Sequence, residues 1–367
     1  MNAIIINLGG LNVARLGCYG NGEIETPCLD RLAAEGFVFD QAFADSPCPA
    51  AARRAWWTAR HQFFEAPGQA GAGISTDQAG SRDQCLLRLL RSNEIQTVLA
   101  RDTAGLCPGE IPEQTGFGRI IELQPGPPDS AKRVFESAKQ WLECEADEGP
   151  NLVFLDCWGV HPPTGPGLDQ AQTVEYFDEQ LGSFVDRLRA LKGWGNALLV
   201  VTSDFGEPIS PNEPGADVPA LGEERVHVPL MLHWPEQAEP ASRSPALVQA
   251  VDLMPTLSEA FGVAVPPSVH GRSLLPLVRF EQRKLREHVC TGVTDREWAI
   301  RTTEWHLIVP QSNPNDVPPG DPRLYVMPDD RWQRNDVARQ FPEVVNELVK
   351  RLLGVRAECG FTSDHPY

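Results

Sequence analysis

Short apolar runs alternate with longer amphipathic stretches along most of this chain. The runs that predict strands and helices in turn cover residues 3–7, 27–35, 95–100, 130–145, 151–156, 174–191 and 197–203. This alternation is typical of a parallel sheet whose strands are joined by helices. Residues 198–201 are apolar at every position, so we expect helices to cover both faces of the sheet. Residues 107–128 are rich in Gly and Pro, lack periodicity, and predict a surface loop.

Local signals mark the ends of the first predicted helix. Pro27 suits the first helical position because proline has no N–H group to leave unsatisfied. The hydroxyl of Thr26 can accept a hydrogen bond from a helix amide, and Gly36 can end the helix in a left-handed conformation. We therefore expect a helix over residues 27–35 that Thr26 caps.

The pattern changes in the last part of the chain. Residues 298–301 and 305–309 predict the two strands of an antiparallel hairpin, and residues 342–353 predict a closing helix. We therefore predict an α/β domain over residues 1–282. A small C-terminal subdomain of antiparallel strands and a helix is expected over residues 283–367.

Charge and hydropathy limit the possible partners. The net charge of -18, from 50 acidic and 32 basic residues, repels a polyanion over a Debye length of about 10 Å. We therefore expect no nucleic acid partner, although a local basic pocket could still bind a small anion. No stretch approaches the roughly 20 apolar residues of a membrane-spanning helix, so no membrane partner is expected.

The start of the chain and its cysteines bear on location. Residues 1–10 carry no positive charge before their apolar run, unlike a secretory signal peptide. The nine cysteines include no Cys-x-x-Cys pair and fit free thiols in a reducing compartment. We therefore expect a cytoplasmic protein.

Two nearby segments carry a recognisable motif. Residues 16–20 read Leu-Gly-Cys-Tyr-Gly, and residues 26–36 read Thr-Pro-Cys-Leu-Asp-Arg-Leu-Ala-Ala-Glu-Gly. Together they resemble the opening of the sulfatases, a family of the alkaline phosphatase superfamily. Further stretches resemble the family in the expected order, namely residues 178–191, 197–207, 228–235, 251–257 and 270–277. The resemblance implies hydrolysis of sulfuric esters. It also implies an alkaline-phosphatase-like fold, with a large mostly parallel sheet between helices and a small C-terminal antiparallel subdomain.

The metal ligands that the resemblance implies are largely missing. Family members hold a divalent cation, usually calcium, which polarises sulfate oxygens and is bound by about six to eight oxygen ligands. The resemblance implies two adjacent aspartates at the end of the first strand, where this chain has Gly9 and Gly10. Asp204 matches a further ligand, but Phe205 replaces the histidine or asparagine that follows it. Asp204 is therefore either a vestigial metal ligand or a cap for the turn at Gly206, and we expect no bound cofactor.

The nucleophile motif is also altered. In the family a cysteine or serine is followed by a proline two positions later and an arginine two positions after that, and the resemblance implies a formylglycine nucleophile made from the cysteine. Here Cys48 stands one residue too early, Ala51 replaces the proline, and Arg53 matches the arginine. A one-residue insertion could bring Cys48 to the site as a catalytic residue; otherwise it is a packed thiol. Arg53 either binds an anion or forms a solvated helix face together with Arg54.

Two tryptophans follow the altered motif on the same predicted helix. Trp56 and Trp57 stand where the family has aliphatic residues. We expect both indoles to be buried and to fill the former cleft.

Histidine and lysine positions bear on general acid catalysis. His161 matches an active-site histidine of the family, and it could equally be a loop histidine that bonds to the backbone. The family places a lysine and a second histidine after the metal-bearing strand. No lysine occurs between Lys192 and Lys284, and no histidine occurs between His161 and His227. That segment therefore offers no general acid.

These losses favour a pseudoenzyme. In this hypothesis a sulfatase scaffold has lost metal-dependent catalysis and serves binding or regulation, with an unknown small anion or protein as partner. The alternative is an active sulfatase or related ester hydrolase with a rearranged site built from Cys48, Arg53, His161 and Asp204. A relative of phosphonoacetate hydrolase or phosphomutase is least supported, because that chemistry needs even more metal ligands.

Overall fold

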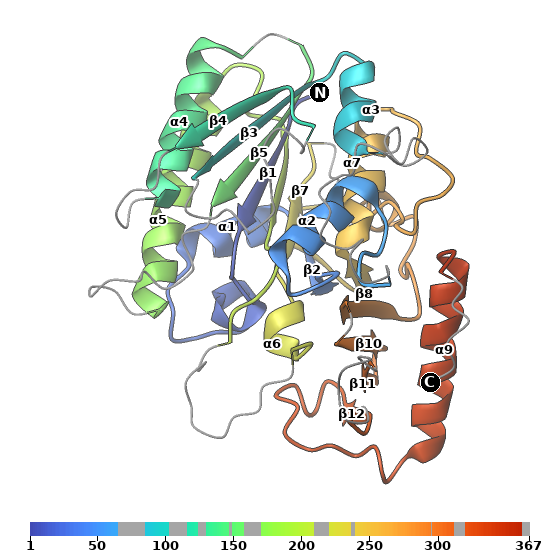
Figure 1. The fold of residues 1–367 in the computed structure, drawn as a ribbon. Coiled ribbons are helices and arrows are strands. Elements are labelled where there is room, and N and C mark those ends of the chain that lie inside the picture. Colours follow the sequence, from blue (N-terminus) through green and yellow to red (C-terminus); the bar gives the residue numbers. More distant parts are fainter. Residues whose placement is uncertain are drawn as a thin grey trace.

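The computed structural model describes residues 1–64, 85–102, 116–123, 130–146, 149–157, 170–208, 220–235, 239–294, 296–311 and 320–361. Within these ranges an eight-stranded sheet dominates, with the strand order β4-β3-β5-β1-β6-β7-β2-β8 (Figure 1). Its strands are β1 (Ala3–Leu8), β2 (Phe37–Phe43), β3 (Gln96–Asp102), β4 (Arg119–Leu123), β5 (Asn151–Cys157), β6 (Leu198–Thr202), β7 (Leu230–His233) and β8 (Ser242–Gln249). β7 runs antiparallel to its neighbours β6 and β2, and the other neighbouring strands are parallel. The predicted large, mostly parallel sheet is confirmed.

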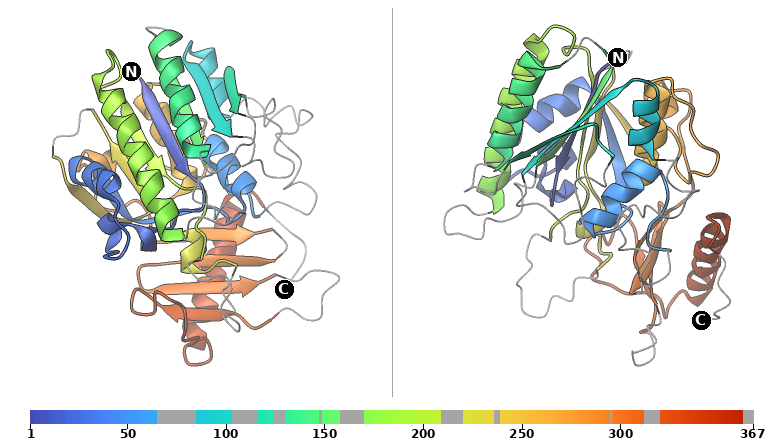
Figure 2. Two further views of the ribbon diagram at one scale, coloured as in Figure 1. Left: turned by 90° about the vertical axis from the view of Figure 1, so that its left-hand side faces the viewer. Right: turned by 45° about the horizontal axis from the view of Figure 1, so that its top comes forward.

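Helices cover both faces of this sheet, as the apolar strands predicted (Figure 2). One face is covered by α1 (Pro27–Glu35), α4 (Ser130–Cys144) and α5 (Gln170–Ala190), and the other by α2 (Pro49–Thr58), α3 (Leu86–Ser92) and α7 (Leu253–Ala260). Alternate residues of β1 show the division, because Ile4 and Ile6 pack with the first group and Ile5 packs with the second. The sheet is therefore held between two apolar cores.

A second, four-stranded antiparallel sheet lies beyond the end of the large sheet toward which β1 runs (Figure 1). Its strands are β9 (Val289–Val293), β10 (Glu297–Arg301), β11 (Trp305–Pro310) and β12 (Arg323–Val326), in the order β12-β11-β10-β9. The helix α9 (Pro342–Glu358) packs against β10 and β11. These elements confirm the predicted hairpin and antiparallel C-terminal unit, and the boundary after residue 282 stays a prediction.

The first helix has the predicted bounds but not the predicted N-cap. The hydroxyl of Thr26 accepts a hydrogen bond from the amide of Gly17 (3.1 Å) and none from a helix amide. The helix amides of Cys28 and Leu29 donate instead to the carboxylate of Asp178 in α5, both at 2.8 Å. A residue far along the chain thus caps α1, which no local sequence pattern indicates.

Two further expectations are wrong. Gly36 ends α1 with an extended backbone (φ -115°) and not in a left-handed conformation. A Cβ atom at Gly36 would lie 2.7 Å from the carbonyl oxygen of Leu232, so the glycine permits the close approach of α1 to β7. The predicted loop over residues 107–128 contains β4. The side chains of this strand are exposed or half-buried, so it lacks the apolar run that marks a buried strand.

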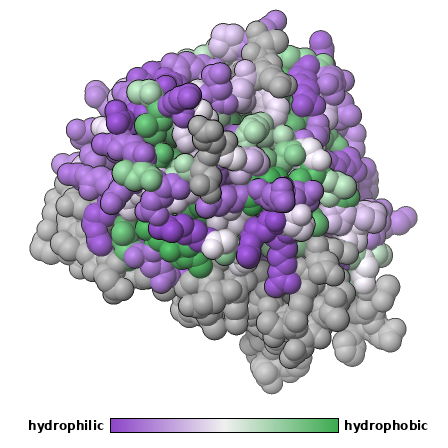
Figure 3. Space-filling model, turned by 90° about the horizontal axis from the view of Figure 1, so that it is seen from above, coloured by the Kyte–Doolittle hydropathy of each residue, from purple (hydrophilic) through white to green (hydrophobic). Residues whose placement is uncertain are grey.

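One face of the molecule shows how hydrophilic and apolar residues are distributed on its surface. Figure 3 shows the molecule from above, where hydrophilic residues predominate and apolar residues form small separate groups. Within the described ranges, none of the helices combines the length and the apolar character needed to cross a membrane.

The helix α2 packs on β5 through one face. Arg53, Trp56 and Trp57 share this face because residues three and four apart are neighbours on a helix. Trp56 and Trp57 are 1% and 6% exposed, and their rings meet Phe154 of β5 edge-on, with centroids 5.9 and 5.2 Å apart. The expected burial of both indoles is confirmed, and they fill the space between α2 and β5.

We expect Trp57→Ala to destabilise the protein strongly, because it leaves a cavity between α2 and β5. Removal of a buried tryptophan typically costs about 3–5 kcal/mol of unfolding free energy, measurable by urea unfolding. Trp332→Ala is the matched control, since Trp332 is 50% exposed and its loss should change stability by about 0.5 kcal/mol or less. Equal effects of the two substitutions would contradict this packing.

Candidate functional site

Three polar residues meet at the carboxyl ends of neighbouring parallel strands. In the strand register Asn7 of β1 lies opposite Asp156 of β5 on one side and Thr202 of β6 on the other. Asp204 follows β6 by two residues, which places it at the same edge of the sheet. Parallel α/β sheets bind ligands at this edge, so we take it as the candidate site.

Arg53 reaches this edge from α2 and bridges two carboxylates. Its Nη1 lies 2.8 Å from Oδ2 of Asp156, and its Nε lies 2.9 Å from Oδ2 of Asp204. The three side chains are between 0% and 5% exposed, so the ion pairs are buried. Arg53, Asn7, Asp156 and Asp204 are called the Arg53 cluster below.

The packing of α2 explains why Arg53 points into the site. Trp57 rests on Phe154, and Arg53 lies one helical turn earlier on the same face. Phe154 and Asp156 are two residues apart on β5, so their side chains leave the same face of the strand. The contact between Trp57 and Phe154 therefore sets Arg53 above Asp156.

Hydrogen bonds from other groups satisfy the remaining carboxylate oxygens. Oδ1 of Asp156 accepts from Nδ2 of Asn7 (2.9 Å), and Oδ1 of Asp204 accepts from the amide of Phe205 (3.1 Å). The amide of Asp204 donates in turn to Oδ1 of Asn7 (3.0 Å). Burial raises the pKa of Asp204, and the charge of Arg53 acts in the opposite direction. Each of the four carboxylate oxygens thus has a donor within the protein.

Among the residues that the structure describes at this edge, the donor set does not fit a calcium ion. Gly9 and Gly10 offer no side-chain oxygen, and the carbonyl of Gly10 accepts a hydrogen bond from the amide of Glu207 (2.9 Å). Gly10 also has a positive φ of +86°, where an aspartate would be strained. The oxygens of Asp156 and Asp204 are already engaged in hydrogen bonds and in ion pairs with Arg53. Calcium requires about six to eight oxygen ligands, more than these residues leave available.

The non-catalytic interpretations of Asp204 and Arg53 from the sequence are wrong. Asp204 does not cap the turn at Gly206, whose amide donates to the carbonyl of Arg225 (2.9 Å). Arg53 is 3% exposed and is not part of a solvated helix face. Arg54, its neighbour on α2, is half-buried.

The structure does not bring Cys48 into the Arg53 cluster. Cys48 is exposed, so the alternative of a packed thiol is wrong as well. It stands at the N-cap of α2, where its amide donates to the hydroxyl of Ser46 (3.2 Å). His161 lies outside the described residues, so its proposed role stays a prediction.

Sequence reasoning missed Asn7 and Asp156 as members of the site. Both are polar residues near the end of a buried apolar strand, and this position is the sequence feature that could have identified them as site residues. Their pairing follows only from the register of β1 against β5, which the sequence alone does not state.

The sequence of this chain is similar to those of known sulfatases. Residues 2–263 match the family model described as Sulfatase, and residues 217–358 match a model described as N-sulphoglucosamine sulphohydrolase, C-terminal. The N-acetylgalactosamine-6-O-sulfatase of Bacteroides thetaiotaomicron is 21% identical over 97% of this chain and 93% of its own length. Arylsulfatase K of Canis lupus familiaris is 26% identical over 48% of this chain and 34% of its own length.

Solved structures share the fold at low identity. The phosphonate monoester hydrolase of Agrobacterium radiobacter superposes with a TM-score of 0.75 at 17% identity, over 98% of this chain and 96% of that chain. A Bacteroides thetaiotaomicron protein of glycosaminoglycan metabolism superposes with a TM-score of 0.78 at 19% identity, over 97% of this chain and 99% of that chain. These likenesses confirm the alkaline-phosphatase-like fold.

We expect Arg53→Leu to destabilise the protein by about 3–5 kcal/mol, because it leaves two buried carboxylates without a counter-charge. Arg54→Leu, at the half-buried neighbouring position, should cost much less. Adding Asp204→Asn to Arg53→Leu removes one of the orphaned charges and should restore part of the loss. Urea unfolding of the four proteins measures these effects, and equal losses for Arg53→Leu and Arg54→Leu would contradict the bridging role.

Proposed function

This chain belongs to the sulfatase family, and we propose that it is a pseudoenzyme within that family, retained for binding or regulation without metal-dependent ester hydrolysis. The observation that carries the proposal is the guanidinium of Arg53 between Asp156 and Asp204. A cation of the chain itself is paired with acids at the strand ends where the family holds a metal ion.

Electrostatics supports this proposal. Two carboxylates and one guanidinium leave a net charge of about one unit negative, which attracts a divalent cation far less than a cluster of carboxylates. Rotating Arg53 away to free its partners would break two buried ion pairs, and breaking such a pair typically costs about 3–5 kcal/mol. A metal ion would therefore have to overcome the interactions that hold α2 on the sheet.

The same contacts limit any role of Arg53 in binding a sulfate group. Its Nε and Nη1 are directed at carboxylates, and a bound anion would compete with them. The partner, whether a small anion or a protein, and the cytoplasmic location stay predictions from the sequence.

The alternative is an ester hydrolase with a rearranged site. In its favour, Arg53 and Asp204 do lie together, and relatives of this chain are named as sulfatases. Against it, the exposed Cys48 is not part of the Arg53 cluster, and metal polarisation supplies several kcal/mol of barrier reduction that these residues would have to replace.

We expect no stoichiometric calcium in the purified protein. Elemental analysis after gel filtration should find far less than one calcium per chain, and added calcium chloride should not raise the melting temperature, because a ligand stabilises only the state that binds it. If the parent protein binds one calcium per chain and the variant Asp204→Asn does not, the proposal is wrong.

We also expect no turnover on a panel of aryl sulfate, phosphate and phosphonate esters beyond the background rate in buffer. The reason is that Pro49 stands where the family has its nucleophile, and that Arg53 already pairs with the two acids at the strand ends. Cys48→Ala is the diagnostic variant, because an exposed thiol can be removed without disturbing the core. Turnover that Cys48→Ala abolishes would instead establish the rearranged hydrolase.

A further inference from the structure

A second cluster of polar side chains lies beside the smaller sheet and shares no residue with the Arg53 cluster. His61 follows α2, His270 precedes α8 (Leu275–Val278), and Cys359 is the C-cap of α9. One potential ligand atom from each of these side chains lies within 4.8 Å of the other two. Three segments far apart in the sequence thus converge, and we call these residues the His–Cys cluster.

The orientation of His61 is set by a buried carboxylate. Nδ1 of His61 lies 2.6 Å from Oδ1 of Asp45, and the amide of Gln62 donates to Oδ2 of Asp45 (2.9 Å). A neutral imidazole that donates from Nδ1 presents the lone pair of Nε2. Histidines that bind metals commonly have their second ring nitrogen oriented by a carboxylate in this way.

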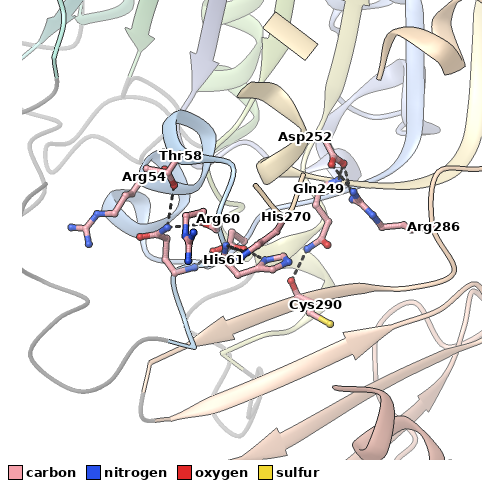
Figure 4. Close-up of polar contacts among 11 residues, drawn as sticks. Arg54, Thr58, Arg60, His61, Gln249, Asp252, His270, Arg286 and Cys290 are labelled. Carbon is pink, nitrogen blue, oxygen red and sulfur yellow. Dashed lines mark hydrogen bonds and ion pairs between the residues drawn. The ribbon is translucent and has the colours of Figure 1, made fainter. Parts of the chain in front are cut away.

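His270 supplies a second imidazole. The amide of His61 donates to Nδ1 of His270 (3.1 Å), and the two rings are stacked with centroids 5.4 Å apart (Figure 4). Burial and the nearby charges of His61 and Arg60 lower the pKa of His270 to about 3, so the ring carries no charge that would repel a cation. Coordination by this ring exchanges the hydrogen bond from His61 for a bond to the metal.

Cys359 supplies a sulfur. Its side chain is mostly buried, with the residue 8% exposed, and burial raises the pKa of the thiol to about 12. The thiol therefore keeps its proton unless a bound cation displaces it. Metal binding here would release one proton to solvent.

A cavity of ≈ 660 Å³ adjoins the His–Cys cluster. Gln249 and Arg286 also line it, and each is held in place: Nε2 of Gln249 donates to the carbonyl of Cys290 (2.6 Å), and Arg286 pairs with Asp252 (Figure 4). The wall is thus polar and ordered by its own hydrogen bonds. Water or a small ligand has room beside the three side chains.

We propose that His61, His270 and Cys359 bind one transition-metal ion of the zinc type, with a further coordination position open to the cavity. Two imidazoles and a thiolate are the donors that such ions prefer, whereas calcium takes oxygen ligands. In a tetrahedral zinc site ligand atoms lie roughly 3.3–3.6 Å apart, so atoms within 4.8 Å of one another need only small side-chain rotations. Three protein ligands with an open fourth position are the arrangement of reactive zinc sites.

The ion would also join parts of the fold. It would link the end of α9 to the segment after α2 and the loop before α8. Because zinc would bind only the folded chain, it should raise the melting temperature in proportion to its affinity.

The test is a titration of the chelator-treated full chain with zinc chloride alone, followed by calorimetry and thermal unfolding. We expect one zinc per chain and a higher melting temperature. Cobalt chloride should produce the near-ultraviolet absorption of a cobalt–thiolate bond. Cys359→Ser and His270→Gln should each weaken zinc binding at least tenfold. Asp45→Asn should weaken it by about 10–100-fold, because the carboxylate only orients His61.

Cys144→Ser is the matched control, since Cys144 is an exposed thiol on α4 far along the chain from the cluster, and it should bind zinc like the parent protein. Circular dichroism without zinc establishes that each variant is folded. No zinc binding by the parent protein, or undiminished binding by folded Cys359→Ser, would overturn the proposal. If that variant fails to fold, the cobalt spectrum of the parent protein decides, because absence of the thiolate band also overturns it. These outcomes are independent of the calcium and ester tests.

Discussion

The guanidinium of Arg53 compensates two carboxylates that would otherwise be buried as bare charges at the ends of β5 and β6. An uncompensated buried charge costs several kcal/mol, so the strand ends, with their acidic residues, can be buried only when α2 is in place. The position of α2 depends in turn on the indoles that pack on Phe154. Charge compensation and apolar packing therefore support each other through one helix.

The glycines at the end of β1 complete this arrangement. Gly10 pairs in a short bridge with Gly206, and a Cβ atom at Gly206 would lie 2.1 Å from the carbonyl oxygen of Glu224. The backbone segments beyond β1 and β6 therefore lie side by side, and the segment at Gly206 also packs closely against Glu224.

The helix α2 connects the two clusters of the molecule. Its middle carries Arg53 to the strand ends, and the turn after it carries His61 to Asp45 and His270. In the proposed pseudoenzyme, the scaffold keeps its core while Arg53 pairs with the acids at the strand ends. If the His–Cys cluster binds a metal ion, the binding depends on nitrogen and sulfur donors and on contacts with the C-terminal helix.

The sequence by itself determined most of the order of strands and helices, because apolar periodicity and proline positions act locally: α1 spans the residues that the pattern predicts, whereas the partly exposed β4 was missed. It also determined that Gly9 and Gly10 cannot supply carboxylates. Only the tertiary structure decided which residues meet at the strand ends. Whether Arg53 is solvated or buried depends on which face of α2 meets β5, and its partner Asp204 lies 151 positions away in the chain. The roles of Asn7 and Asp156 likewise follow from strand register, which arises from packing of the whole sheet and not from any local pattern.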